Sequence, residues 1–272
     1  MIDDRRLATV VLLFCFLSGP ATYAQSSSMG LNAPQLYEKG MNSLIRVGVS
    51  RNDINAVDYI RRSAELGYAP AQVLLGYFYD TGNRLSQNSG EAADWYKKAA
   101  KQDDHLAAWL LGRLYFTGFG IPRDLSAAES WLQKAADHGD PFGQYLLGMS
   151  RVERNDYPQA AEWFLKAAMQ GLPQAQQQLG ELLLQGKGVN ADKFEAYVWL
   201  LVSFEAGKRR VADELQALEA ELGANKVEEA KTKARELQEK VTRDVAAHGC
   251  VWPGFDNTVP LPPPPDVQRF CR

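Results

Sequence analysis

The chain has 272 residues, of which 46% are hydrophobic and 23% are charged, and its formal net charge is −3. These values are ordinary for a globular protein. The basic residues are scattered and form no patch that would hold nucleic acid or an anionic membrane surface. We therefore expect no nucleic-acid partner, and the informative features are patterns along the chain.

Residues 1–24 have the features of a cleaved secretory signal. Arg5 and Arg6 precede an apolar run, Leu7–Leu17, and Thr22-Tyr23-Ala24 offer small residues at the two positions that signal peptidase reads. The run is about half the length that a membrane-spanning helix needs. We expect cleavage after residue 24, a periplasmic or secreted protein, and no membrane span after cleavage. An uncleaved anchor is the alternative.

Export changes how the cysteines are interpreted. Removal of Cys15 leaves Cys250 and Cys271, an even pair in an oxidising compartment. We expect them to form a disulfide, and closing a loop of about twenty residues would contribute about 3 kcal/mol in the chain-entropy model. The alternative is two free thiols in a loose tail.

After a polar linker at 25–35, the chain repeats itself. One marker is the glycine of a Leu-Gly pair, found at Gly76, Gly112, Gly148 and Gly180, with Gly40 as a degenerate earlier copy. A second marker is one aromatic residue per unit, found at Tyr59, Trp95, Trp131, Trp163 and Trp199. Both markers recur every 36 residues except across the fourth unit, where the step is 32. The missing residues fall between Gly148 and Asp156, in a loop, where deletions are tolerated best.

Each unit predicts two helices. In the third unit, apolar residues of 107–116 recur at helical spacing. Gly118 supplies a left-handed stop, and Asp124 can cap the second helix, which carries Trp131. We expect the repeated tryptophans to form the core rather than a ladder that stacks a ligand.

The stretch LLGRLYFTGFGIPRD followed by AAESWLQKAADHGD resembles the Sel-one-like repeat, a relative of the tetratricopeptide repeat. The resemblance covers about 36–207 and implies an all-α, right-handed solenoid of about five helix-turn-helix repeats. Four departures stand out: Tyr59 replaces tryptophan, Arg84 replaces the second loop glycine, the fourth unit lacks its loop, and Val202-Ser203 replaces the usual Ala-Ala pair.

The repeat fades after Gly207. Residues 208–244 predict two amphipathic helices that would cap the stack, and the second has an apolar stripe from Val227 to Val241. The tail, 245–272, contains both remaining cysteines and the run Leu261–Pro265, which favours an extended polyproline II conformation. This tail is interpreted either as a docking element or as a brace for the cap.

No sequence motif for catalysis is present: GxSxG, HExxH, CxxC, SxxK and the phosphate-binding loop are all missing. We therefore expect no catalytic residues, no cofactor and no metal. One alternative is a divalent ion near His105 and His138, which lie beside aspartates in connections between successive units. A solvated acidic edge is the simpler interpretation.

The resemblance implies a binding module rather than an enzyme. We expect a non-enzymatic adaptor in the bacterial periplasm that holds a partner protein on its concave surface, with a role in envelope signalling, polysaccharide production, motility or virulence. The candidate contacts are non-pattern positions of the first helices: Tyr77, Trp109, Arg113, Phe116 and Arg151, and more weakly Gln72, Asp80, Gln144, Gln177 and Glu181. The alternative is β-lactam binding or hydrolysis, as in cysteine-rich relatives, although this chain has no cysteine between Cys15 and Cys250.

Overall fold

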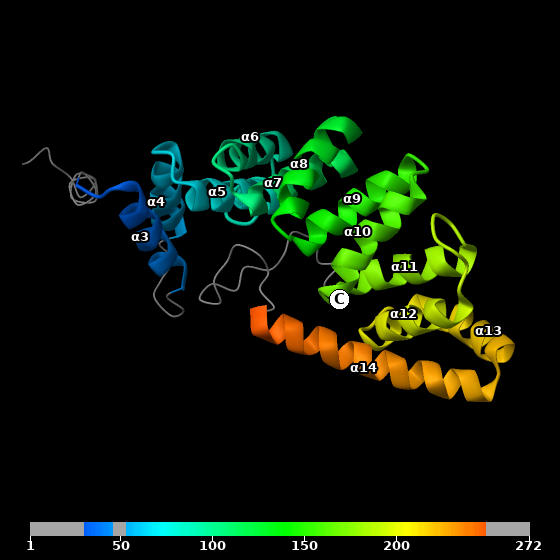
Figure 1. Ribbon diagram of the computed structural model, residues 1–272. Coiled ribbons are helices and arrows are strands. Elements are labelled where there is room, and N and C mark those ends of the chain that lie inside the picture. The colour runs from blue at the N-terminus through cyan, green and yellow to red at the C-terminus, as the bar shows by residue number, and fades with distance from the viewer. Residues whose placement is uncertain (1–29, 46–52, 249–272) are drawn as a thin grey trace, which may run out of the picture.

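The computed structural model describes residues 30–45 and 53–248, and throughout these residues the only regular elements are helices (Figure 1). The predicted signal segment, Cys250 and Cys271 lie outside the described residues, so export and the disulfide stay predictions. None of the helices in the described part of the chain has an apolar stretch long enough to cross a bilayer.

Each repeat contributes a first and a second helix. The first helices are α3 (Ala33–Ile45), α5 (Ala69–Thr81), α7 (His105–Thr117), α9 (Pro141–Glu153) and α11 (Pro173–Gln185). The second helices are α4 (Asp53–Glu65), α6 (Ser89–Ala100), α8 (Leu125–Asp137), α10 (Tyr157–Met169) and α12 (Lys193–Glu205). A 3-10 turn (Arg209–Val211), α13 (Ala212–Leu222) and α14 (Ala224–His248) follow.

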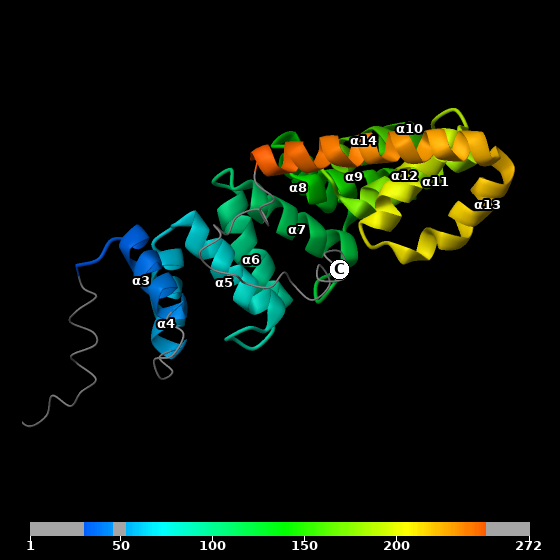
Figure 2. The ribbon, with the colours of Figure 1, turned by 90° about the horizontal axis from the view of Figure 1, so that it is seen from below.

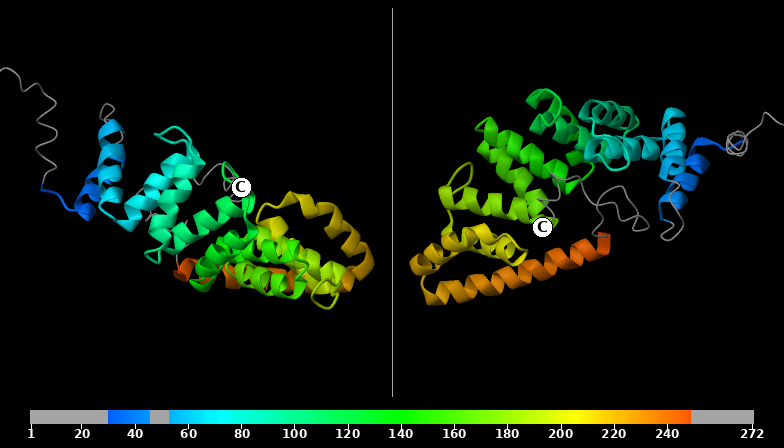
Figure 3. Two further views of the ribbon diagram at one scale, coloured as in Figure 1. Left: turned by 90° about the horizontal axis from the view of Figure 1, so that it is seen from above. Right: turned by 180° about the vertical axis from the view of Figure 1, so that it is seen from behind.

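Successive helices pack against one another from α3 to α12, which confirms the predicted all-α solenoid of five helix pairs. The stack is elongated, with α3 and α4 at one end and α13 at the other (Figure 3). α7 also contacts α9, whereas in the described ranges no two second helices of neighbouring repeats contact each other as extensively. At α7 and α9 the stack therefore bends toward its first helices, and we call the side of the first helices the inner face.

The repeated glycines let the two helices of a repeat approach closely. A Cβ atom at Gly112 would lie 2.7 Å from Cγ of Leu132, closer than real carbon atoms pack. The same clearance recurs where Gly76 faces Tyr96, Gly148 faces Phe164 and Gly180 faces Leu200. Each partner is fully buried and directly follows the repeated tryptophan in sequence.

The tryptophans themselves lie less deep than the sequence suggests. Trp199 is 7% exposed, but Trp95, Trp131 and Trp163 are half-buried at the edge of the core. A lysine covers the open face of each of these three rings; for example, Lys98 Nζ lies 3.5 Å from the centroid of Trp95. Each of these tryptophans thus packs one face of its ring against the core. The residue that follows it in sequence is the one that fills the core interior.

The turns within the repeats follow the predicted end signals. Gly118 has φ 67°, and the Asp124 carboxylate accepts a hydrogen bond from the N–H of Ala127 at 2.9 Å. The fourth repeat closes its shorter loop differently: Asn155 takes the left-handed conformation, with φ 60°, just before the cap Asp156. The shortening therefore lies in the connection and leaves both helices at full length.

The capping helix α14 extends beyond the last repeat. Its predicted stripe is buried against α12 and α13: Val227, Ala230, Ala234 and Val241 are at most 6% exposed. Half-buried Leu237 also packs against the cluster formed by α10, α11 and Trp199. From the end of the stack, α14 runs back along α12 toward the central repeats (Figures 1 and 2).

Candidate functional site

Side chains of the first helices form a row along the inner face, which we call the inner stripe. Its members recur at spacings of three and four residues, so they share one side of each helix. They are Val73, Tyr77 and Asp80 on α5; Leu106, Trp109, Arg113 and Phe116 on α7; Phe142, Tyr145 and Met149 on α9; and Gln177 and Glu181 on α11. Members on neighbouring helices touch: the rings of Trp109 and Phe142 lie 5.2 Å apart.

Four of the five residues predicted to contact a partner belong to the inner stripe, but their exposure differs. Tyr77, Trp109 and Arg113 are each 1% exposed, whereas Phe116 is half-buried. The structure thus places these four residues on a common side, which the sequence alone did not determine. Their depth was not evident from the sequence, because it depends on how neighbouring repeats pack, and an arginine is ordinarily exposed.

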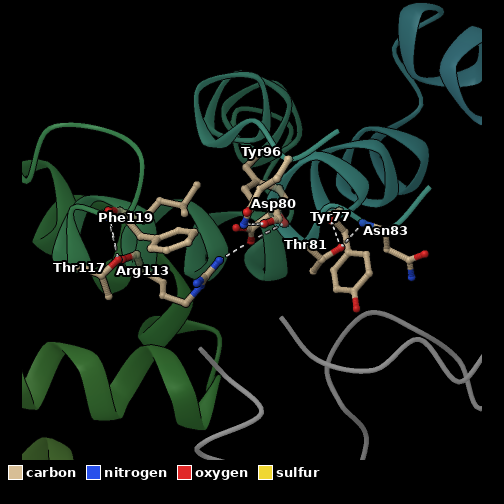
Figure 4. Close-up of polar contacts among 10 residues, drawn as sticks. Tyr77, Asp80, Thr81, Asn83, Tyr96, Arg113, Thr117 and Phe119 are labelled. Carbon is tan, nitrogen blue, oxygen red and sulfur yellow. Dashed lines mark hydrogen bonds and ion pairs between the residues drawn. The ribbon is translucent and has the colours of Figure 1, made fainter. Parts of the chain in front are cut away.

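A buried polar cluster joins the second and third repeats (Figure 4). The Arg113 guanidinium on α7 pairs with the Asp80 carboxylate on α5, and the two side chains are 1% and 2% exposed. The Tyr96 hydroxyl of α6 donates to the same carboxylate at 3.2 Å, and burial together with the Asp80 charge raises the pKa of Tyr96 well above its ordinary value. A buried charge is stable only when paired, so Asp80 and Arg113 fix the register of α5 and α7.

Arg151 lies away from the inner stripe, in a network between α8 and α9. Its guanidinium is 3.8 Å from the Glu129 carboxylate, which also accepts hydrogen bonds from Ser150 and from Arg154 Nε, the latter at 2.6 Å. Burial alone would raise the pKa of Glu129, but these hydrogen bonds and the two arginines hold it below its ordinary value. Arg151 therefore ties neighbouring helices together.

Gln72 and Gln144 connect repeats through the backbone. The side-chain amide of Gln72 donates to the carbonyl of Ala64 at 3.1 Å, and that of Gln144 donates to the carbonyl of Ala136 at 3.4 Å. Gln176 does the same to Ala168 at 3.2 Å. This role was missed from sequence, yet a signal exists: all three glutamines stand four residues before the repeated glycine.

The α9 and α11 part of the inner stripe combines aromatic and polar groups that are half-buried. Gln177 donates to Glu181 at 2.8 Å on α11. Burial, and to a smaller extent the Glu181 charge, raise the pKa of Tyr145 on α9 to about 12. Tyr145 thus stays a neutral hydrogen-bonding phenol, and this part of the inner stripe offers both apolar surface and polar groups.

His105 and His138 come together as the repeat spacing suggests. Their rings stack 5.8 Å apart with an interplanar angle of 10°. The aspartates do not complete a site, since within residues 30–45 and 53–248 no three His, Cys, Asp or Glu side chains are placed to hold one metal ion. Asp140 instead caps α9, where its carboxylate accepts the Gly143 N–H at 2.7 Å.

A cavity of about 380 Å³ opens between α10, α11, α12 and the loop of the fifth repeat. Its lining is mostly apolar and includes Leu165, which is 45% exposed, with Glu162 and Glu195 at the rim. Leu183 lines it at the position where the second and third repeats have Tyr79 and Tyr115. This cavity was not anticipated from the sequence.

Comparison with known proteins agrees with this architecture. A model of the Sel1 repeat matches residues 29–68, 69–104, 105–140, 141–172 and 173–208. These ranges begin and end at the same connections as the helix pairs described above. Among curated protein sequences, no match is found.

Two solved structures are similar to the chain. One is a protective antigen present in uropathogenic Escherichia coli strains that displays an SLR fold; it is 30% identical, with a TM-score of 0.70 over 83% of this chain and 49% of that chain. This chain therefore spans about half the length of that antigen. The other, a Sel1 repeat protein from Oxalobacter formigenes, is 24% identical, with a TM-score of 0.60 over 82% and 92% of the two chains, and supports the fold alone. With five matched repeats that coincide with its five helix pairs, the chain belongs to the Sel1 repeat family.

Proposed function

We propose that this chain is an exported, non-enzymatic adaptor of the bacterial envelope that binds a partner protein through its inner face. The observation that carries the proposal is the half-buried cluster of Phe142, Tyr145 and Met149 on α9 beside Gln177 and Glu181 on α11. Aromatic residues and methionine are enriched at protein interfaces, and polar groups surround them there. Aromatic and methionine side chains surrounded by polar groups give a binding surface its specificity for one partner.

The contrast between constant and variable positions supports the same proposal. The repeated glycines and their buried partners are confined to packing. The inner stripe differs from helix to helix: Trp109 and Arg113 on α7 correspond to Tyr145 and Met149 on α9, and to Gln177 and Glu181 on α11. Solenoids bind through such variable positions on a constant frame, and a Sel1 repeat protein is suited to protein interaction.

The test is site-specific photocrosslinking in cells. A benzophenone amino acid at Tyr145 is expected to capture a discrete partner protein, whereas the same group at Phe119, an exposed loop residue outside the inner stripe, is expected to capture none. The captured protein, once purified, should bind the wild-type chain and lose affinity for Tyr145→Ala and Met149→Ala. The same crosslinked proteins from Tyr145 and Phe119 would refute the proposal that the inner face binds the partner. Unchanged affinity of both alanine variants for the captured protein would refute it as well.

Export and the lack of catalysis are tested separately. N-terminal sequencing of the protein from envelope fractions is expected to begin at Gln25. The purified protein is expected not to hydrolyse nitrocefin, a chromogenic β-lactam. A mature chain that retains residues 1–24 contradicts the export proposal, and turnover of nitrocefin contradicts the adaptor role.

A further inference from the structure

The cavity between α10, α11 and α12 is separate from the inner stripe. On α11 it is lined by Leu179 and Leu183, which lie two residues after Gln177 and Glu181 of the inner stripe. Residues two positions apart lie on nearly opposite sides of a helix, so the cavity uses the side of α11 that is turned away from the inner stripe. Its volume of about 380 Å³ lies within the range of about 300–1,000 Å³ that is usual for small-molecule sites.

The cavity has apolar residues where the preceding repeat has an ion pair. Arg151 and Glu129 lie 3.8 Å apart and join α9 to α8. Counted from the repeated glycine and the repeated tryptophan, the residues at the same two positions one repeat later are Leu183 and Ala161. Both line the cavity. A ligand at this place therefore meets aliphatic groups rather than a bridge between charged side chains.

Trp199 differs from the other repeated tryptophans in what accompanies it. On α6, α8 and α10 a lysine three residues after the tryptophan lies over the ring, as Lys166 does at 3.9 Å from the centroid of Trp163. On α12 the residue at that position is Val202, which is fully buried, and Trp199 lines the cavity. The face of an aromatic ring is negative and attracts cations. The helix supplies no ammonium group for this tryptophan, so a ligand can supply it.

The charged residues of the lining are both acidic. Glu195 pairs with Lys233 of α14, whereas Glu162 is exposed and makes no ion pair within the described residues. Among the lining residues of the described chain there is no Lys, Arg or His. In the adjoining loop, Lys187 is directed elsewhere, with its Nζ 5.4 Å from the centroid of the Tyr157 ring. Glu162 is therefore the carboxylate that is available to a cation.

We propose that this cavity binds a small amphipathic cation, an alkyl or aryl group that carries an ammonium. The apolar part of the ligand enters between α10, α11 and α12, and the ammonium pairs with Glu162 at the rim. Leu165 is 45% exposed and lies three residues after Glu162 on the same side of α10, so the apolar lining continues up to the carboxylate. The site selects an amine over a carboxylate with the same apolar chain.

Binding of octylammonium to the purified protein tests the proposal, with octanoate as the anionic probe of equal chain length. Tryptophan is labelled with ¹⁵N, and the indole N–H signals are followed by NMR, with the Trp199 signal assigned from Trp199→Phe. Octylammonium is expected to shift the Trp199 signal saturably and to leave the Trp95 signal in place. Octanoate is expected to bind about tenfold more weakly, because Glu162 and Glu195 repel its carboxylate.

Two variants examine the two parts of the ligand. Glu162→Gln is expected to weaken octylammonium binding about threefold, as the loss of one exposed carboxylate should. Asp94→Asn, at the corresponding exposed position of the second repeat, is the control and is expected to leave binding unchanged. Leu183→Tyr introduces the residue that the second and third repeats have at this position. It is expected to weaken binding about tenfold by occupying space in the cavity, while helical circular dichroism stays unchanged.

Equal affinities for octylammonium and octanoate would overturn the assignment of a cation, and so would unchanged binding in Glu162→Gln. A Trp199 signal that neither probe moves would overturn the site itself. A short peptide of alternating lysine and leucine that shifts this signal when octylammonium does not would assign the cavity to a protein partner instead. The measurements contain no partner protein, so their result is independent of crosslinking at Tyr145 in cells.

Discussion

Gly112 and Asp140 show how single atoms control the stack. Gly112 leaves the space that the Leu132 side chain fills between α7 and α8, where a Cβ would lie 2.7 Å from Cγ. Asp140 ends a connection between repeats with a carboxylate that is 4% exposed and hydrogen-bonded to the backbone of α9. The space available limits which residues fit at Gly112, whereas the buried charge determines the behaviour of Asp140. The two residues therefore call for different experiments.

Gly112→Ala is expected to destabilise the protein by about 1–3 kcal/mol through overpacking, although alanine is the better helix former. The loss should shrink in a Leu132→Ala background, because the crowded Cγ and Cδ2 atoms are then gone. Gly90→Ala is the control, since the nearest atom to its Cβ is 3.4 Å away. Urea unfolding of the single and double variants measures the coupling, and additive losses would show that the clearance is not what matters.

Asp140→Asn is expected to change how stability depends on pH. Burial raises the pKa of Asp140 to about 6, despite hydrogen bonds from the backbone N–H groups of Gly143 and Phe142. Because the folded pKa exceeds the unfolded value, the group stabilises the fold below about pH 4, and this contribution is lost as pH rises through about 6. Asparagine keeps the cap without the charge.

The free energy of unfolding of the asparagine variant, relative to wild type, is therefore expected to increase by about 2 kcal/mol between pH 4.5 and 7.5. Urea titrations of both proteins at several pH values measure this difference, in which other titrating groups cancel. A constant difference across the range would mean that the carboxylate titrates normally.

The paired helices of each repeat show which features can be predicted from local sequence and which depend on packing between helices. The glycine stop at Gly118 and the cap at Asp124 are predictable because they depend on backbone conformation close in sequence. The depth of a side chain is not predictable in the same way. Trp131 recurs as regularly as Leu132, yet Trp131 is half-buried and Leu132 is fully buried. The repeat period indicates that the side chain at a position contacts the core. The neighbouring helix determines how deeply that side chain is buried.

Leu132→Ala is accordingly expected to destabilise the protein more than Trp131→Ala. The leucine leaves a cavity facing Gly112 and should cost about 2–5 kcal/mol. The tryptophan keeps one face toward Lys134 and water, so its loss should cost about 1–2 kcal/mol despite its larger area. Chemical denaturation of the two variants provides the comparison, and a larger loss for Trp131→Ala would restore the tryptophan as the main core residue.

At the scale of the whole molecule, the sequence predicts the order of the repeats and the helical cap. It predicts only some of the residues that make up the inner face. The sequence selects Tyr77, Trp109, Arg113 and Phe116 as non-pattern positions of the first helices, but it does not determine which side of the stack they face. That Arg113 pairs with Asp80 could not be inferred, because the two residues are 33 positions apart and meet only when α5 and α7 pack. Arg151 does not join them because it lies two residues after Met149, on another side of α9, where it faces Glu129 of α8.

Ala234→Glu tests the long-range role of α14. Ala234 is fully buried, so a carboxylate there should weaken the packing of α14 on α12 by about 3 kcal/mol or more. Hydrogen exchange is expected to accelerate in α10 to α12, which share the clusters that Leu237 contacts, and to stay unchanged in α5 to α7. Thr232→Glu, on the exposed side of α14, is the control. Equal acceleration throughout the stack would indicate that the solenoid unfolds as one unit.

The return of α14 along α12 has a consequence for biosynthesis. The early repeats find their packing partners within the next helix or two, so they can fold as the chain emerges from the ribosome. α12, including Trp199, lies next to α14, which is translated only after α13. Nascent chains that end before α14 therefore expose an apolar surface on the last repeat, and molecular chaperones are expected to engage the growing chain at this stage.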